Sequence, residues 1–503
     1  MSLGSVLSVA RTALAAQQVV IQTAGHNIAN AATEGYSRQR VELAGNVPQR
    51  WSYGSVGTGV VVTEVRRARD GLLDAGVRRE AGGEAAAGTR HELLAAVEGV
   101  LGEPSDAGLA GAMDAFWSSW SDLATAPTSR AARSVVLQRA GTAATTLNNF
   151  DARLTDLRAE TTLRLDNALG EVNGLAAQVA RLNGRIVATE AGSGHEATDL
   201  RDQRDLAVDR LAQFGDVQTL PRADGSVQLL FGTHTLVDGG HARQFSRVAD
   251  ARGDAALALS DAPGRPLQPS GGSTGAMLDF LNRDLRGTQD QLDAVANALA
   301  ATVNAVHGRG VTAAGVAPPS FFVDRTSGAF DAAASPFAVP PARGAVSART
   351  IRVNAAIEAD LGLVATSSDP ARPTDNDVAL ALAGLRTDAS VAAGAGPPVE
   401  TRFTLPDRAG AAGALRPATA PTTFAEFYRA AATGLAVRVQ GAESDATVRA
   451  TLAAQARGRR DAVTGVNVDE ELTALMSAQQ AYAAAAKVVS AADEMMQTIL
   501  GMV

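Results

Sequence analysis

Apolar residues recur at alternating intervals of four and three along the first thirty positions of the chain. This heptad spacing places a hydrophobic stripe on one face of a helix. The stripe ends near Asn30, shortly before Gly35, and only Gln17 interrupts it. We therefore predict an N-terminal amphipathic helix whose stripe consists of Leu3, Leu7, Ala10, Leu14, Ile21, Ala24 and Ile28.

The segment 468–503 carries a similar stripe with a period of seven residues. Asn467 can cap a helix there, Glu470 stands three residues later, and the acidic residues 469–471 suit the positive end of a helix dipole. No Pro or Gly interrupts the segment before Gly501, so we predict one long helix. Its stripe consists of Val468, Leu475, Tyr482, Val489, Met496 and Val503, widened by Leu472, Ala486 and Leu500.

Both ends of the chain are thus predicted to be helices with an apolar face. An isolated amphipathic helix is only marginally stable in water, so each needs a packing partner. The periodicity leaves two arrangements open. The helices can close one domain as an intramolecular pair, or they can pack on neighbouring subunits and polymerise.

The middle of the chain alternates between helical and strand patterns. Residues 37–43 and 60–66 are rich in β-branched residues and are predicted to be strands. Helical periodicity dominates from about 70 to 210 and again over 278–306 and 423–463. Short strand patterns separated by the turn dipeptides Asp224-Gly225 and Gly239-Gly240 fill the segment between the first two helical regions.

These patterns predict a mainly α fold with β modules (α+β): a coiled-coil-like inner domain, a long-helix bundle and small β-rich outer modules. The inner, polymerising domain comprises residues 1–35 and 466–503. The bundle, with its N-terminal strands, comprises 36–214, 271–310 and 423–465. The two outer modules are a small β module over 215–270 and an irregular, β-containing module over 311–422.

Composition narrows the classes of function. The 503 residues are 46 % hydrophobic and 19 % charged, values typical of a chain that buries a core. The net charge of −8 gives no indication of a nucleic-acid-binding surface. The absence of cysteine excludes disulfides, thiolate catalysis and Cys-ligated zinc. We expect no membrane-spanning segment, because the sequence has no stretch of about 18 apolar residues. We expect no secretory signal peptide, because no basic region precedes an apolar run at the N-terminus.

One motif raises the possibility of catalysis. Gly271-Gly272-Ser273-Thr274-Gly275 matches the G-x-S-x-G pattern of serine hydrolases and precedes a helical segment. A nucleophile elbow needs a strand that enters the turn, and Pro266 and Pro269 argue against such a strand. We therefore favour a helix N-terminal loop and keep a secreted hydrolase using Ser273 as the alternative from another class.

Other candidate residues receive structural interpretations. No two of the six histidines have the i, i+4 spacing of a helical zinc site, so no metal and no cofactor is predicted. Asp199, Asp202 and Asp205 lie on one side of a helix start, where we expect them to cap the helix at the surface. The aromatic residues of 116–120 have the spacing of a bundle core.

The two ends of the chain resemble a known family. The run through Asn27, Asn30, Thr33 and Gly35 to Tyr36-Ser37-Arg38-Gln39 is similar to the shared start of bacterial flagellar axial proteins, the rod, hook and hook-associated proteins. The segments 465–471 and 479–482 resemble their shared end. Three internal features resemble the hook-associated FlgK family in particular: Ser37 after Gly35-Tyr36, the segment Phe116-Trp117-Ser118-Ser119-Trp120, and residues 199–205 together with 303–307 and Phe321-Phe322.

The resemblance implies a structural, non-enzymatic subunit of a tube, with terminal helices in the inner layer and the middle of the chain outside. It implies a position at the extracellular hook–filament junction and secretion through the flagellar type III route without a cleaved signal peptide. A hook or distal rod protein remains the alternative within the class.

The resemblance also implies partners and an interface. The implied partners are copies of the chain in a ring or tube, hook protein, the next hook-associated protein, and an export chaperone at the C-terminal helix, with no nucleic acid and no membrane. The expected subunit-interface residues are Leu3, Leu7, Leu14, Ile21, Asn27, Ile28, Asn30, Gly35, Tyr36, Arg38, Val468, Leu472, Leu475, Tyr482, Val489 and Met496.

Overall fold

The computed structural model describes residues 3–51, 54–102, 108–269, 271–331, 346–387 and 424–501. Over these residues the chain is mainly helical with small antiparallel sheets, which confirms the predicted fold class. It forms two compact units. The first unit comprises residues 1–87, 166–276 and 446–503, and the second comprises 88–165 and 277–445.

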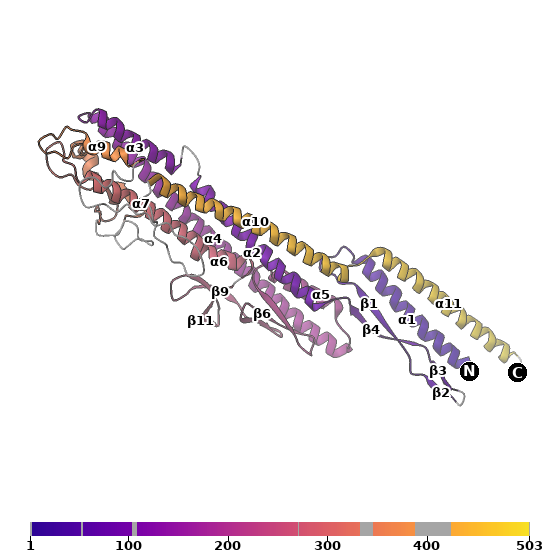
Figure 1. The fold of residues 1–503 in the computed structure, drawn as a ribbon. Helices are drawn as coiled ribbons and strands as arrows, with labels where there is room; N and C mark the ends of the chain where they lie inside the picture. Colours follow the sequence, from indigo (N-terminus) through magenta and orange to yellow (C-terminus); the bar gives the residue numbers. More distant parts are fainter. Residues whose placement is uncertain are drawn as a thin grey trace. The chain divides into compact units, whose positions relative to one another are not determined.

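Long helices dominate both units (Figure 1). The α-helices are α1 (Leu3–Ala29), α2 (Gly71–Leu101), α3 (Leu109–Thr125), α4 (Arg130–Ser193), α5 (Thr198–Leu211), α6 (Gly272–Asp279), α7 (Leu285–His307), α8 (Ala355–Ala359), α9 (Asp377–Gly384), α10 (Phe424–Thr464) and α11 (Val468–Leu500). A π-helix, Phe280–Asp284, joins α6 to α7, and a 3-10 helix, Leu361–Leu363, follows α8. Helices α2, α4 and α10 contribute residues to both units.

The strands are short and occur in antiparallel pairs and small sheets. They are β1 (Gln39–Gly45), β2 (Gln49–Trp51), β3 (Gly54–Val56), β4 (Val60–Arg67), β5 (Val217–Pro221), β6 (Val227–Phe231), β7 (His234–Asp238), β8 (His241–Ala242), β9 (Phe245–Ala249), β10 (Ala255–Leu259), β11 (Ala262–Leu267), β12 (Phe322–Asp324) and β13 (Ile351–Val353).

In the first unit the two terminal helices lie side by side (Figure 1). Helix α1 ends at Ala29, close to the predicted end, and α11 begins directly after its cap, Asn467, whose side chain accepts a hydrogen bond from the Asp469 N–H at 3.0 Å. The acidic first turn of α11 stands at the positive end of its dipole. The predicted helices at the two ends of the chain are confirmed.

A two-stranded ribbon leads from α1 into the rest of the first unit. Strand β1 pairs with β4 from Gln39 opposite Arg67 to Gly45 opposite Val60, and a bulge follows Glu42. Gly59, at a φ of 108°, passes so close to α1 that a Cβ there would lie 2.2 Å from Thr12 Oγ1. The ribbon is therefore held against α1 at a point where only glycine fits.

The β module of the first unit contains two sheets, with strand orders β5-β6-β7-β8 and β11-β10-β9. Alternate residues of β6, from Val227 to Phe231, are buried, as expected for a half-buried strand. Strand β11 includes Pro266, since it lies at a sheet edge, where proline removes no ladder hydrogen bond. The strand ends at Leu267, four residues before the first glycine of the Ser273 motif.

The second unit is built around aromatic side chains. Phe116, Trp117 and Trp120 of α3 are buried, which confirms their predicted place in a bundle core. Phe116 and Trp120 contact Phe321 with ring centroids 6.2 and 5.6 Å apart. His307, at the end of α7, lies 5.3 Å from Phe321 by the same measure and accepts a hydrogen bond from the Ala365 N–H.

The predicted irregular module over 311–422 is described over 311–331 and 346–387. Here β12 pairs with β13, the strand predicted around Ile351, and the short helices α8 and α9 follow. The remaining residues of this predicted module lie outside the described residues.

Among the described helices, α1 alone is long and apolar enough to cross a membrane by composition. Its window within Gly4–Ala29 has a mean hydropathy of 1.2, and 11 % of that window is buried. Core helices and signal sequences meet the same criterion. The low burial of α1 bears directly on the candidate site.

Candidate functional site

Helix α1 packs on α11 and also contacts β1 and β4. The buried apolar residues of the two terminal helices are all alanines: Ala10, Ala16 and Ala24 on α1, and Ala478 and Ala492 on α11. Alanine lets two helices approach closely while it removes little apolar area from water. We call these five residues the alanine seam.

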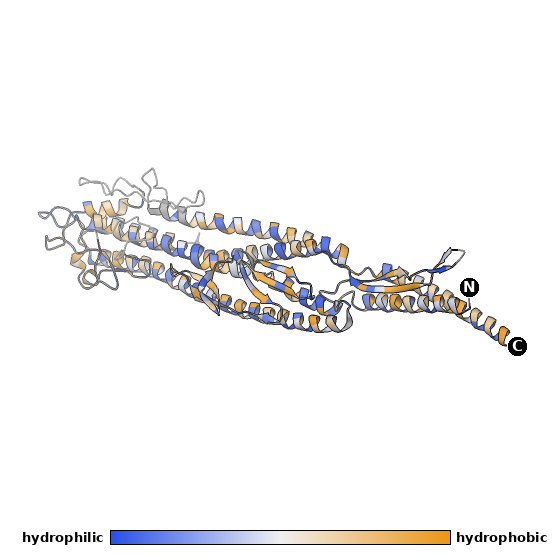
Figure 2. Cartoon of the chain, turned by 90° about the horizontal axis from the view of Figure 1, so that it is seen from below, coloured by the Kyte–Doolittle hydropathy of each residue, from blue (hydrophilic) through white to orange (hydrophobic). Residues whose placement is uncertain are grey.

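Larger apolar side chains flank the alanine seam on α11 and remain in solvent. Each is between 37 % and 71 % exposed. Figure 2 shows the C-terminal turns of α11 mostly in the hydrophobic colour. We call this set the open flank of α11; it consists of Val468, Leu472, Met476, Tyr482, Val488, Met495, Met496, Ile499 and Leu500.

The predicted stripes therefore divide between covered and uncovered positions. On α1, Leu7, Leu14, Ile21 and Ile28 are half-buried, and the side chain of Leu3 lies outside the described residues. On α11, Leu475 and Val489 are half-buried, whereas Val468, Leu472, Tyr482 and Met496 belong to the open flank. Val503 lies outside the described residues.

Near the end of α1, the side chain of Asn27 forms hydrogen bonds that connect α1 to β1 and α11. Its amide Nδ2 donates to the Gln39 carbonyl and to Glu471 Oε2, both at 2.9 Å. Its Oδ1 accepts from the Gln39 N–H at 2.9 Å and from the Tyr36 hydroxyl at 2.7 Å. Asn27 is 1 % exposed, so these four contacts satisfy a fully buried amide.

Tyr36 and Arg38 continue this connection. Burial, together with the negative charges of Asp199, Asp202 and Glu471, raises the pKa of Tyr36 well above its ordinary value, so its hydroxyl remains a donor. Arg38 pairs with Glu470 at 2.7 Å and with Glu471 at 2.6 Å, and its N–H donates to the Thr464 carbonyl. The loop after α1 is thereby tied to both sides of the α10–α11 junction.

Ser37 connects the same loop to α5. Its N–H and hydroxyl donate to the two oxygens of Asp202, at 3.0 and 2.8 Å. Arg67 Nη1 bridges Asp202 and Asp205, at 2.8 Å from each, and Arg69 Nη1 reaches Asp205 at the same distance.

Asp205 is ionised despite its burial. Burial raises its pKa, but the positive charges of Arg69, Arg67 and Arg204 outweigh that effect and lower the pKa to about 2. Arg69 completes the group through Asp74, with Nη2 2.9 Å from Oδ1. We call the contacts that join residues 36–39 to α1, α5 and α11 the joint.

The joint corrects one prediction. Asp202 and Asp205 do not cap a helix at the surface, because Asp202 is buried, Asp205 is half-buried, and both form ion pairs with arginines of and beside β4. Helix α5 begins after Ala197 without a side-chain cap. Arg67 at the end of β4 and Arg69 two residues later were the missed signal, because like charges that lie close together with little exposure require partners of opposite sign.

Asn30 and Gly35 shape the turn between α1 and the joint. Asn30 Nδ2 donates to the His26 carbonyl at 3.0 Å and closes the last turn of α1. Gly35 has a φ of 79°, and a Cβ there would meet Leu206 Cβ at 3.0 Å. The position therefore requires glycine for both its backbone conformation and its space.

A groove of about 380 Å³ borders the joint. Its charged lining is paired within the chain: Asp209 accepts from Arg78 and from Arg460, at 2.7 Å in each case. Arg210 pairs with Glu34 at 2.9 Å. The groove is thus lined by groups that already neutralise one another.

Ser273 lies in the first turn of α6. Its N–H donates to the Gln213 carbonyl, and the Thr274 hydroxyl donates to the Phe214 carbonyl. Gly272, at a φ of 68°, approaches Phe214 so closely that a Cβ would lie 2.1 Å from its carbonyl carbon. The glycines and hydroxyls of this motif dock the start of α6 onto the end of α5.

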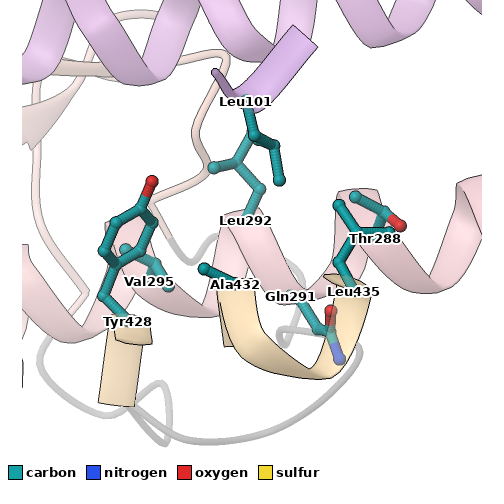
Figure 3. A pocket seen from close by; sticks show the side chains of 8 residues that line it. All are labelled: Leu101, Thr288, Gln291, Leu292, Val295, Tyr428, Ala432 and Leu435. Carbon is teal, nitrogen blue, oxygen red and sulfur yellow. The ribbon is translucent and has the colours of Figure 1, made fainter. Parts of the chain in front are cut away.

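Two further features of the described residues carry no ligand chemistry. No group of three His, Asp or Glu side chains in this part of the chain could hold a metal ion. In the second unit, a cavity of about 30 Å³ lies between α7, α10 and the last residue of α2, Leu101 (Figure 3). Its lining is mostly apolar, and its volume corresponds to about one water molecule.

Comparison with known proteins places these features in a family. The model of the "Flagellar hook-associated protein FlgK helical domain" matches residues 94–322, and that of the "Flagellar basal body rod FlgEFG protein C-terminal" matches 462–502. Flagellar hook-associated protein 1 of Bacillus subtilis is 28 % identical over 98 % of this chain and 97 % of its own length. The chain belongs to the FlgK family of flagellar hook-associated proteins.

Other members match over shorter segments. Flagellar hook-associated protein 1 of Salmonella typhimurium is 29 % identical over 64 % of this chain and 59 % of its own length. The structure of the flagellar hook junction protein FlgK from Burkholderia pseudomallei is 26 % identical, with a TM-score of 0.46, over 50 % of this chain and 46 % of that one. Membership makes this chain a structural component of the bacterial flagellum.

Proposed function

We propose that this chain is the adaptor that joins hook to filament, and that it assembles through α1 and α11. The open flank of α11 carries this proposal. Contiguous exposed apolar side chains are costly in water and mark surfaces that a partner covers. Family membership supplies that partner class: further copies of the chain and other axial proteins of the flagellum.

In this proposal the alanine seam and the open flank have different roles. The seam holds α1 and α11 together as a pair, whereas the flank contributes to subunit interfaces through Val468, Leu472, Tyr482 and Met496. The half-buried Leu7, Leu14, Ile21, Ile28, Leu475 and Val489 extend the same interface where a neighbour reaches the seam's edge. Asn27, Asn30, Gly35, Tyr36 and Arg38 act indirectly, because their contacts fix the pair on the rest of the first unit.

The domain division predicted from the sequence becomes part of this proposal. Residues 1–35 and 466–503 form the inner, polymerising domain, and the bundle and the two outer modules provide the lateral contacts of the subunit. The joint then lies at the inner boundary of the bundle.

The exposed surface of α11 also supports inferences about the export route and the partners of the chain. We infer that the chain leaves the cell through the flagellar type III route without a cleaved signal peptide. Hook protein and the next hook-associated protein are its axial neighbours, and an export chaperone covers α11 before assembly. The weak burial of α11 supports this order, because a helix whose residues mostly remain accessible to solvent in the monomer is available to successive partners.

The proposed role is not enzymatic. The Ser273 motif is accounted for by the docking of α6 onto the end of α5. Replacement of Ser273 by alanine should leave motility unchanged. Normal assembly combined with lost motility in Ser273→Ala would support the hydrolase instead.

The experiment that tests the adaptor role places charge on the open flank. Leu472→Asp combined with Ile499→Asp should abolish incorporation at the hook tip in a host whose own gene is deleted, measured as filaments per cell by electron microscopy. Leu220→Asp is the matched control, because Leu220 is 51 % exposed and lies on β5, a strand of the β module. Normal filament numbers in the double variant would refute the proposal.

Deletion of residues 468–503 provides a second, coarser test. The shortened chain should be secreted in reduced amount and fail to join the hook, while the aromatic core of the second unit stays folded by tryptophan fluorescence. Incorporation of the shortened chain would contradict the role of α11.

A further inference from the structure

The methionines of the chain are unevenly distributed. Four of the seven lie within residues 468–503, and the chain contains no cysteine, so methionine is its only sulfur. Met113 and Met277 are 3 % and 4 % exposed, whereas Met476, Met495 and Met496 on the open flank are 55 %, 48 % and 37 % exposed. The accessible thioethers among the described residues are thus concentrated on the surface that we propose for assembly.

Position on the helix makes these three residues sensitive points. Met496 stands seven residues after Val489 and fourteen after Tyr482, so it continues their stripe beside the alanine seam. Met495 stands seven residues after Val488 and continues the stripe on the other side of the seam. Met476 follows Leu472 by one helical turn. A polar group at any of these sites replaces an apolar one on the surface that we propose for assembly.

We propose that Met476, Met495 and Met496 form an oxidation-sensitive surface that controls whether α11 can dock. This inference rests on the proposed function. A peroxide transfers one oxygen atom to the thioether: the O–O bond breaks, an S–O bond forms, the sulfur loses two electrons, and hydrogen peroxide leaves as water. The product, a sulfoxide, converts a flexible apolar side chain into a polar one.

The effect is confined to the unassembled subunit. In the monomer the three sulfurs are open to solvent, whereas in the proposed assembly neighbouring helices cover them. A methionine sulfoxide reductase, with a dithiol as reductant, reverses the change by removing the oxygen as water and leaving a disulfide. Assembled subunits are therefore protected, and oxidised free subunits are excluded until they are reduced.

The test uses the full-length chain, hydrogen peroxide and hooks isolated from a strain that lacks this protein. Trypsin cleaves after Arg460 and Lys487, the only lysine, so Met476 falls in the peptide 461–487, and Met495 and Met496 fall in 488–503 together with Met502. We expect sulfoxide at all three, resolved by fragmentation, while Met113 and Met277 stay unmodified. The amount of chain captured by the hooks should fall about tenfold or more, since a polar oxygen buried without a partner is costly.

Matched variants separate this effect from general damage. Met476→Leu/Met495→Leu/Met496→Leu should bind hooks like the wild type and keep that binding after peroxide. Met113→Leu/Met277→Leu should lose binding after peroxide as the wild type does. Treatment with a methionine sulfoxide reductase should restore the wild type. Far-UV circular dichroism checks that each form is folded, and Met495→Leu/Met496→Leu replaces the triple variant if that one does not fold.

Two outcomes overturn the inference: undiminished capture of the wild type with all three sulfoxides present, or equal loss of capture in the triple leucine variant. Failure of the proposed function is recognised separately, because Leu472→Asp/Ile499→Asp would then bind hooks normally without any oxidant.

Discussion

Helices α7 and α11 have the same sequence pattern, but α7 is mostly buried and α11 is mostly exposed to solvent. Both show apolar residues at heptad spacing, yet 15 of the 23 residues of α7 are buried and only three of the 33 residues of α11 are. Helix α7 finds its partners within the second unit, among them β12, β13 and α9. A heptad pattern therefore predicts that one face of a helix becomes buried. It does not indicate whether the same chain or a partner buries that face.

The two helices are also held by different forces. Helix α7 buries leucine and valine and begins directly after a π-helix, with no side-chain cap at Asp284. Helix α11 buries two alanines and one glutamate, and Asn467 caps it. Large buried side chains therefore stabilise α7, whereas the alanine seam, a helix cap and polar anchors stabilise α11 in the monomer.

The largest expected effect comes from truncating a core side chain of α7. Leu299→Ala should lower the free energy of unfolding by about 2–5 kcal/mol, because Leu299 is fully buried and the change leaves a cavity. Leu472→Ala on α11 should change it by no more than about 0.5 kcal/mol. Urea unfolding followed by the fluorescence of Trp117 and Trp120 measures the first; far-UV circular dichroism measures the second. Equal losses of unfolding free energy in the two variants would show that α7 and α11 do not differ in how packing stabilises them.

The buried position of α7 also creates two opposed titrations. Burial lowers the pKa of His307 to about 4, and burial with the nearby charges of Asp151 and Asp290 raises the pKa of Asp293 to about 6. As pH falls from 6.5 to 4, the unfolded chain takes up the proton of His307 first, which destabilises the fold. Over nearly the same range the folded chain takes up the proton of Asp293 first, which stabilises it.

These opposed terms should nearly cancel in the wild type. Relative to it, His307→Gln should gain roughly 3 kcal/mol between pH 6.5 and 4, and Asp293→Asn should lose roughly 3 kcal/mol. Urea unfolding at several pH values, read by tryptophan fluorescence, measures both. His234→Gln, on β7 of the first unit, is the control. Parallel pH profiles for the two variants would contradict the assignment.

On α11 the corresponding anchor is polar. Glu471→Ala should weaken the docking of α11 on α1 by about 2–3 kcal/mol, because it leaves Arg38 without its buried carboxylate partner and removes one of the two acceptors of the Asn27 amide. Hydrogen exchange of the amides of α11 measures the loss. Glu470→Ala is the matched control: Glu470 also pairs with Arg38 but is exposed, so its removal should cost less than about 1 kcal/mol.

The smallest effect concerns the cap. Asn467→Ala should cost about 1 kcal/mol and be seen as faster exchange confined to the first turn of α11. Asn467→Asp keeps the acceptor and should preserve protection. Uniformly faster exchange along the whole helix would show that the cap, rather than the alanine seam, holds α11.

The sequence predicted the helices well because their periodicity is a local property. The ends of α1 and α10 lie within two residues of the predicted positions, and the strands around residues 39 and 60 were found. The covered line on α11 was not found, because Ala478 and Ala492 contribute little to a hydrophobic pattern and gain their role only when α1 approaches.

The joint could be predicted only in part. Resemblance pointed to Asn27, Tyr36 and Arg38, but no local pattern indicated that Ser37 would meet Asp202, 165 residues away. The aspartates of α5 looked like surface residues because their spacing matches a helix face. Only the fold brings Arg67 and Arg69 beside them and makes their burial affordable.

The composition of the alanine seam limits which substitutions can accumulate there during evolution. A methyl group is the smallest side chain that can line such a contact, so a larger residue at any position of the alanine seam would push apart the elements that pack there. A larger side chain at one position can be accommodated only if the alanine opposite it becomes glycine, and glycine weakens a helix. Positions 10, 16, 24, 478 and 492 should therefore change rarely, and in matched pairs, among descendants of this gene.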